Sequence, residues 1–125
     1  MKIILNSTVK NIKYDKLDKK IAESYVAKSN ASNKNALYDS YIRALRWGSD
    51  RLELNAKSGG GGILAVVTNG SFIDGTAMDG VRKSFVEEFS KIYCFNLRGN
   101  ATKSDKKEGG NVFGNSAGTT IAITL

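Results

Sequence analysis

The pattern of apolar positions in the second half of the chain predicts a strand followed by a polar loop. Ile63 to Val67 is a continuous apolar run with three β-branched residues, which is typical of a strand covered on both faces. The glycines Gly59 to Gly62 precede this run and predict the end of the element before it. Turn-forming residues fill Asn69 to Asp79, so we expect a loop after the strand.

A helix and a second strand are expected after this loop. Val81, Phe85 and Phe89 recur every four residues between charged positions, which predicts an amphipathic helix. Asp79 is its expected N-cap. Ile92 to Leu97 returns to strand character. A strand, a helix and a strand at this spacing predict a right-handed crossover between parallel strands, and therefore an α/β sheet.

Two helices are expected upstream of the glycines, and one strand at the end of the chain. The apolar spacing predicts the first helix over about Asp15 to Ser29 and the second over about Ala36 to Leu54. Gly99 to Gly118 is polar and glycine-rich, and Thr119 to Leu125 alternates as a strand does. We expect no membrane-spanning segment and no secretory signal.

Length and composition predict a single domain, 1–125, with a basic helical part at 10–57 and a strand–helix–strand–strand part at 62–125. The chain has 125 residues and 41% hydrophobic content, enough for a modest core. Its one cysteine, Cys94, excludes an internal disulfide and a cysteine-based zinc site. We expect Cys94 to be a small buried residue in a reducing, cytoplasmic setting. The absence of histidine excludes Ser-His, Cys-His and His-metal chemistry.

The formal net charge of +7 is concentrated in the first half of the chain. Solubility alone explains such a charge, and so does a polyanionic partner such as nucleic acid. The charge by itself does not choose between the two. The basic residues gather on the two upstream helices and just before them: Lys10, Lys13, Lys16, Lys19, Lys20, Arg43, Arg46 and Arg51.

Several blocks of the sequence, taken in order, resemble a known family. Asn35 to Leu45, the glycine loop, and Gly62 to Phe72 resemble the later part of N6-adenine DNA methyltransferases of the Asn-Pro-Pro-Tyr type. Phe95 to Asn100 and Lys107 to Phe113 are similar to the methyltransferase region of Type ISP restriction-modification enzymes. Those enzymes are single chains that join nuclease, helicase-like translocase, methyltransferase and target-recognition parts. The resemblance covers about Lys10 to Leu125.

The resemblance implies a partial Rossmann-like methyltransferase fold of the α/β class, made of helices and the later strands of a doubly wound sheet. It implies that Ile63 to Val67 is the fifth strand, Ile92 to Leu97 the sixth and Thr119 to Leu125 the antiparallel seventh. The helices Ala36 to Leu54 and Val81 to Phe89 would precede and follow the fifth strand.

The parts of the family's active site that perform the reaction have no counterpart in this sequence. The family binds S-adenosylmethionine through a glycine-containing motif after the first strand, and holds the flipped adenine with Asn/Asp-Pro-Pro-aromatic after the fourth. This chain has no proline, so the tetrapeptide cannot be present, and the first three strands are missing. We therefore expect no catalytic residue, no metal and no cofactor for this chain alone.

The resemblance places the loop after the fifth strand beside the target-base pocket. There an apolar side chain packs on the extruded base, a contact worth about 1–3 kcal/mol in comparable sites. Phe72 and Met78 are the candidates; the alternative is that Phe72 caps the sheet edge and Met78 fills a gap. Asn69 and Asp74 are the expected polar neighbours. The candidates for contact with the DNA backbone are Lys13, Arg43, Arg98 and Lys103; the alternative for Arg98 and Lys103 is a solvated loop.

The sequence favours a fragment of a site-specific DNA adenine N6-methyltransferase of a restriction-modification system, inactive alone. One alternative is a basic nucleic-acid-binding module without catalysis. The other is a subunit of a split methyltransferase, completed by a partner that carries the missing strands. DNA is the expected partner in each case. The missing half of the enzyme, or a second copy of this chain through the exposed sheet edge, is a further candidate, and no membrane partner is expected.

Overall fold

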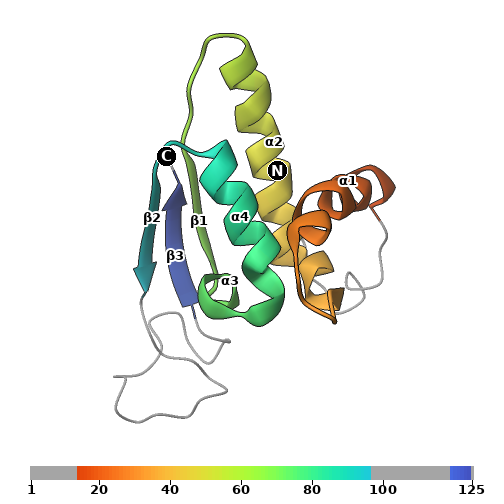
Figure 1. Cartoon of the computed structure of the whole chain (residues 1–125). Coiled ribbons are helices and arrows are strands. Elements are labelled where there is room, and N and C mark those ends of the chain that lie inside the picture. Colours follow the sequence, from red (N-terminus) through yellow and green to blue (C-terminus); the bar gives the residue numbers. More distant parts are fainter. Residues whose placement is uncertain (1–13, 97–118, 125) are drawn as a thin grey trace.

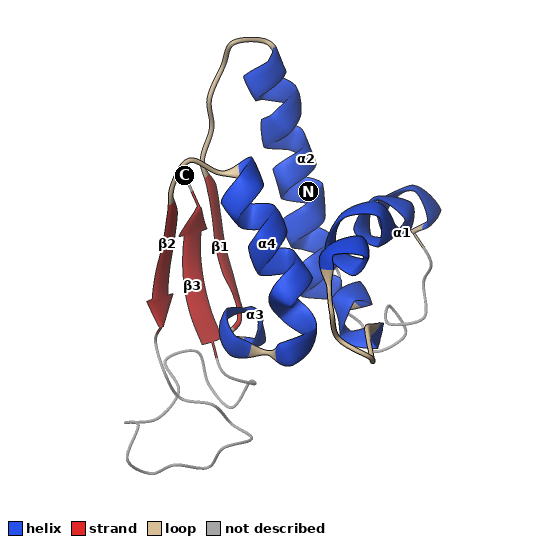
Figure 2. Cartoon of the chain, in the orientation of Figure 1, coloured by secondary structure: helices blue, strands red, loops and turns tan. Residues whose placement is uncertain are grey.

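The computed structural model describes residues 14–96 and 119–124 of the chain. Within these residues, helices and a three-stranded sheet form two layers. Figure 2 shows the helices gathered on one side of the sheet. None of the described helices has the length and apolar character needed to cross a bilayer.

The first predicted helix is present and contains one π-helical segment. α1 (Asp15–Ile21) continues directly into the π-helical η2 (Ala22–Val26). Ile21 and Tyr25 lie four residues apart and are both fully buried. This helix therefore faces the core along one apolar stripe, as its periodicity predicts.

The second predicted helix is divided at Asp39. The 3₁₀ turn η3 (Asn35–Tyr38) precedes it, and α2 (Ser40–Lys57) follows it. Asp39 itself is extended, with ψ of 150°, so the two helical pieces do not share one continuous set of backbone hydrogen bonds.

The glycine run ends α2 as predicted. The amide of Gly59 donates to the carbonyl oxygen of Ala56 and that of Gly60 to the carbonyl oxygen of Asn55, both at 3.0 Å. Gly59 has φ of +80°, a conformation that a residue without a Cβ adopts at low cost. This pair of bonds satisfies carbonyls that the end of the helix leaves unpaired.

The sheet has the strand order β1-β3-β2. β1 (Leu64–Asn69) and β2 (Ile92–Asn96) are both antiparallel to β3 (Thr119–Thr124), so β1 and β2 run in the same direction on either side of it (Figure 1). The strands expected from the sequence are present. The expected crossover differs in one respect, because β1 and β2 are not neighbours and β3 lies between them.

The connection between β1 and β2 is more helical than predicted. The expected loop contains α3 (Ser71–Asp74) and the 3₁₀ turn η4 (Thr76–Met78), and α4 (Asp79–Glu88) follows. The predicted N-cap is wrong, because Asp79 is already the first helical residue and Met78 occupies the cap position. The Asp79 carboxylate instead accepts hydrogen bonds from the Ser29 hydroxyl at 2.5 Å and the Asn30 amide at 2.9 Å.

The core lies between the helices and one face of β1. Phe85 of α4 is at its centre, where its ring meets those of Tyr25, Phe72 and Phe89 edge to face at centroid distances of 6.2, 6.5 and 5.5 Å. The other buried apolar side chains of this core are Ile21, Leu37, Ile42, Leu45, Met78 and Val81.

Two expectations about burial are wrong. β1 is covered on one face only, because Leu64 and Val66 pack on the core whereas Ile63 and Val67 are more than half exposed. Cys94, expected to be buried, is exposed with the rest of β2. The described helices lie on a single side of the sheet, which leaves the other face of β1 open, and β2 is an edge strand in which every residue is exposed (Figure 1).

Candidate functional site at the carboxyl ends of β1 and β2

In open α/β sheets, ligands bind beyond the carboxyl ends of the strands. β1 and β2 end at the same end of the sheet, at Asn69 and Asn96. These two residues pair with Thr119 and Thr120 at the start of β3. α3 lies at this end of β1 in Figure 1. The residues predicted to surround a target base are therefore at the edge where an α/β protein places its functional groups.

Asn69 shapes the turn that leaves β1. Its side-chain Oδ1 accepts hydrogen bonds from the amide and the hydroxyl of Ser71, at 2.9 and 2.7 Å. This arrangement is an Asx turn, which allows the chain to pass directly from a strand into a short helix. The carbonyl oxygen of the Asn69 side chain is thus used within the loop itself.

Arg82 of α4 holds the same loop from the core side. Its Nη1 donates to the carbonyl oxygens of Phe72 and Gly75, both at 3.0 Å. Gly75 itself has no room for a side chain, because a Cβ there would overlap the carbonyl oxygen of Ser71. Arg82 is not recognisable from the sequence, because no local pattern marks an arginine whose partners are backbone carbonyls of another element.

Phe72 and Met78, the two predicted base contacts, are both core residues here. Each is 3% exposed; Phe72 packs against Phe85, and the Met78 sulfur accepts a hydrogen bond from the Tyr41 hydroxyl at 3.8 Å. Burial raises the pKa of Tyr41 to about 12, so its hydroxyl remains a donor at neutral pH. Both side chains therefore anchor the loop to the hydrophobic core.

The two predicted polar neighbours lie nearer the surface. Asp74 is exposed and Asn69 is partly exposed. Because the core takes up the two apolar candidates, Asn69 and Asp74 are the members of the predicted pocket that a ligand can reach in this structure.

Arg43, predicted to contact the DNA backbone, is used inside the chain. Its guanidinium binds the Asp18 carboxylate through two hydrogen bonds of 2.7 and 2.9 Å, and it lies 5.3 Å from the centre of the Tyr14 ring. The same hydrogen bonds lower the pKa of Asp18. The other three candidates, Lys13, Arg98 and Lys103, lie outside the described residues.

Arg46 is a second basic residue with a structural position. It is 3% exposed and binds Glu88 through two hydrogen bonds of 2.8 and 2.9 Å and Asp50 through one of 2.9 Å. Burial is the largest single influence on the pKa of Arg46 and lowers it, but the hydrogen bonds to Glu88 and the nearby Tyr25 and Asp50 together outweigh burial, so the pKa is raised. Lys20 also binds Asp50, at 2.9 Å. These cations join the helices to one another, so they do not form a free basic surface.

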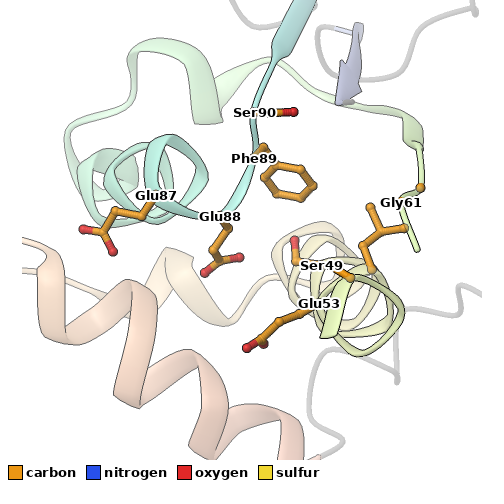
Figure 3. Close-up of a pocket in the computed structure, with 10 residues that line it drawn as sticks. Ser49, Glu53, Gly61, Glu87, Glu88, Phe89 and Ser90 are labelled. Atoms are coloured by element: carbon orange, nitrogen blue, oxygen red, sulfur yellow. The ribbon is translucent and has the colours of Figure 1, made fainter. Parts of the chain in front are cut away.

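A cleft of about 440 Å³ opens at the opposite end of the sheet. It lies between the C-terminal parts of α2 and α4, and Figure 3 shows Ser49, Glu53 and Phe89 around it. Its residues Gly61 and Ser90 precede β1 and β2, so the cleft faces the amino ends of these strands. That is the end from which ligands of α/β sheets are normally absent.

Two features of the described residues bear on a metal and on S-adenosylmethionine: the grouping of their acidic side chains and the form of the turn after β1. Within residues 14–96 and 119–124, no three acidic or cysteine side chains converge as metal ligands. The turn after β1 is closed by the bonds between Asn69 and Ser71 and packed from below by Phe72. It therefore lacks the open, glycine-lined form of a nucleotide-binding loop.

Comparison with known proteins relates the chain to one segment of much larger enzymes. A nuclease-deletion mutant of the Type ISP restriction-modification enzyme LlaGI, in complex with a DNA substrate mimic, is 39% identical with a TM-score of 0.80. The match covers 92% of this chain and 9% of that one. The ATP-dependent Type ISP restriction-modification enzyme LlaBIII, bound to DNA, is 47% identical with a TM-score of 0.80, over 91% of this chain and 8% of its own.

A third structure, the DrdV–DNA complex, is 39% identical with a TM-score of 0.79, over 91% of this chain and 11% of that one. No protein-family model and no curated protein matches the chain. The chain is thus similar in sequence and fold to a segment of Type ISP restriction-modification enzymes. It spans about a tenth of the length of the proteins it matches.

Proposed function

We propose that this chain forms the later part of the catalytic domain of a DNA adenine N6-methyltransferase belonging to a restriction-modification polypeptide. In this role it shapes one side of the target-base pocket and does not transfer methyl groups alone. The observation that carries the proposal is the likeness to LlaGI and LlaBIII over 91–92% of this chain at 39–47% identity. Both of those structures contain DNA or a DNA mimic.

The strand directions support a partial Rossmann-like methyltransferase fold. β1 and β2 run the same way and are connected through α4, and the last strand, β3, is antiparallel to both. That direction is the one implied for the seventh strand by the resemblance to the methyltransferases. The rest of the doubly wound sheet would be supplied by other parts of the polypeptide.

The loop from Asn69 to Asp79 is the proposed wall of the base pocket. Asn69 and Asp74 offer polar groups at its surface, while Phe72 and Met78 shape it from beneath. Arg82 holds the loop in place through two carbonyl oxygens. A fixed loop of this kind lowers the entropic cost of holding an extruded base.

Methyl donation and amine activation would come from elsewhere. S-adenosylmethionine supplies the methyl group in this family, and the turn after β1 in this chain does not have the form of a nucleotide-binding loop. The chain has no proline, so it also lacks the tetrapeptide that holds the adenine amino group. For these reasons the isolated chain is expected to be inactive.

A replacement experiment tests the proposal. The segment of LlaBIII that matches this chain is exchanged for residues 1–125, and transfer of methyl groups from S-adenosylmethionine to DNA is measured alongside DNA binding. We expect methylation by the chimera and none by the isolated chain. Asp74→Ala in the chimera should reduce methylation, whereas Val86→Ala, on the outer face of α4, should not.

Two results would overturn the proposal. One is a chimera that binds DNA but does not methylate it. The other is methylation by residues 1–125 alone. Tight, salt-sensitive DNA binding by the isolated chain would instead favour the basic nucleic-acid-binding module, because binding through phosphate contacts weakens steeply with salt.

A further inference from the structure

The face of the sheet that is turned away from the helices is apolar and open. Side chains alternate along a strand, so the residues of β1 between those that pack on the core point to the other side. Ile63, just before β1, and Val67 within it are 64% and 55% exposed. On β2, Tyr93 and Phe95 are 51% and 65% exposed.

Val67, Tyr93 and Phe95 belong to one surface, and Ile63 directly precedes β1. The strand register pairs Ile121 with both Val67 and Phe95, and the next position on the same face pairs Ile123 with Tyr93. Directly paired positions share a face of the sheet. We call Ile63, Val67, Tyr93 and Phe95 the open face. Exposed apolar side chains gathered on one face of a sheet mark an interaction site.

β1, which contributes Val67 to the open face, also has an edge that no described strand pairs with. Among the described strands, β1 pairs with β3 alone. The six residues of β1, Leu64 to Asn69, include neither a charge nor a proline, the features by which natural edge strands prevent pairing. Next to it, α2 exposes Trp47 and Leu54, at 42% and 62%.

A second copy of this chain would not cover all of this surface. Two copies that pair through their β1 edges extend the sheet sideways and leave both open faces in solvent. Two copies stacked on their open faces leave both edges unpaired. A polypeptide that adds a strand at the edge and a helix across the face covers both, which is the usual arrangement in α/β sheets. Each copy also carries a net charge of +7, which opposes self-association.

We infer that the open face and the β1 edge are the surface on which this chain docks against the remaining part of a Type ISP restriction-modification polypeptide. This inference rests on the proposed function, because it takes its partner from the same matches. In those proteins, 89–92% of the chain lies outside the matched segment and is available to cover the surface. The docking contact is apolar at the open face and involves backbone hydrogen bonds at the β1 edge.

Cysteine labelling read by mass spectrometry tests the inference. Val67→Cys places a thiol on the open face, and Val86→Cys, at a position 74% exposed on α4, is the matched control. In the isolated chain both thiols should react at similar rates with a maleimide. In the LlaBIII chimera, Val67→Cys should react at least about tenfold more slowly while Val86→Cys is unchanged.

A second arrangement covers the case of a chimera that does not fold. The two variants are co-expressed with LlaBIII from which the matched segment has been deleted, and any complex is labelled in the same way. Equal reactivity of the two thiols in the chimera or in the complex would overturn the inference. Two other results would also overturn it. One is a chain that stays a soluble monomer and forms no complex with the co-expressed LlaBIII, and the other is a stable homodimer in which Val67→Cys is protected.

Methylation by the chimera is a separate readout. A chimera that protects Val67→Cys without methylating DNA would retain the docking surface and reject the proposed function. A chimera that methylates DNA while Val67→Cys stays fully reactive would support the proposed function and reject the docking surface.

Discussion

Replacing Gly80 by alanine is expected to destabilise this chain, although the same change stabilises an ordinary helix. Gly80 is the second residue of α4 and is buried. A Cβ at this position would overlap the carbonyl oxygen of Tyr25, and would lie 2.9 Å from its carbonyl carbon and 3.0 Å from the amide nitrogen of Ser29. The obstacle is the backbone of the neighbouring helix, so no rotation of a side chain relieves it.

The size of the effect follows from two opposing contributions. Helix propensity favours alanine over glycine by about 1 kcal/mol. Overpacking costs about 1–3 kcal/mol, and the upper end applies because the two helices must separate. The free energy of unfolding should therefore fall by about 2 kcal/mol, and for a chain of this size Tm should fall by about 8 °C.

Urea unfolding, followed by the fluorescence of Trp47 and by far-UV circular dichroism, measures this difference. Gly61→Ala is the matched control, because a Cβ at Gly61 meets no atom within 4 Å. We expect its stability to stay close to that of the parent chain. If Gly80→Ala is as stable as the parent or more so, the close approach of α4 to the first helix is refuted.

Three further predictions concern charged groups and the thiol. The hydrogen bond from the Asn30 amide lowers the pKa of Asp79 from its usual 3.8, so the Asp79 carboxylate stabilises the fold above that pH and this stabilisation is lost on acidification. The urea concentration at the unfolding midpoint should therefore decrease as the pH is lowered below about 4, and it should decrease less steeply for Asp79→Asn. Glu88→Gln should lower the free energy of unfolding by about 2 kcal/mol because it weakens the two hydrogen bonds to the buried Arg46, and an unchanged urea midpoint would contradict this role. Cys94 is an exposed residue, but partial burial of its thiol raises its pKa. Because the thiolate is the reactive form, DTNB should label Cys94 in the native chain more slowly than free cysteine at pH 8, and the labelling rate should rise above pH 9.

The order of helices and strands follows from local sequence. The four-residue spacing of Val81, Phe85 and Phe89 predicts α4 because a helix places residues four apart on one side. Gly59 to Gly62 predict the end of α2 because only a residue without a Cβ takes a left-handed conformation at low cost. The absence of histidine and proline excludes whole classes of chemistry, since these follow from composition and need no coordinates.

The candidate site was predictable only in part. The stretch from Asn69 to Asp79 was found as a loop after a strand, because turn-forming residues are visible in sequence. Its two helical turns and its support by Arg82 were not, since they depend on contacts with α4. The part played by Arg43 was also hidden, because Asp18, which binds it, lies on another helix.

What the sequence alone determined about this protein is the order of its main helices and strands and the absence of histidine and proline from its side chains. Both depend on neighbouring residues or on composition. The tertiary structure decided that β3 lies between β1 and β2, that the described helices cover one face of the sheet, and that Arg43 and Arg46 join the helices. These features depend on pairings between segments far apart in the chain, and hydrophobic periodicity carries no information about which distant segments will meet.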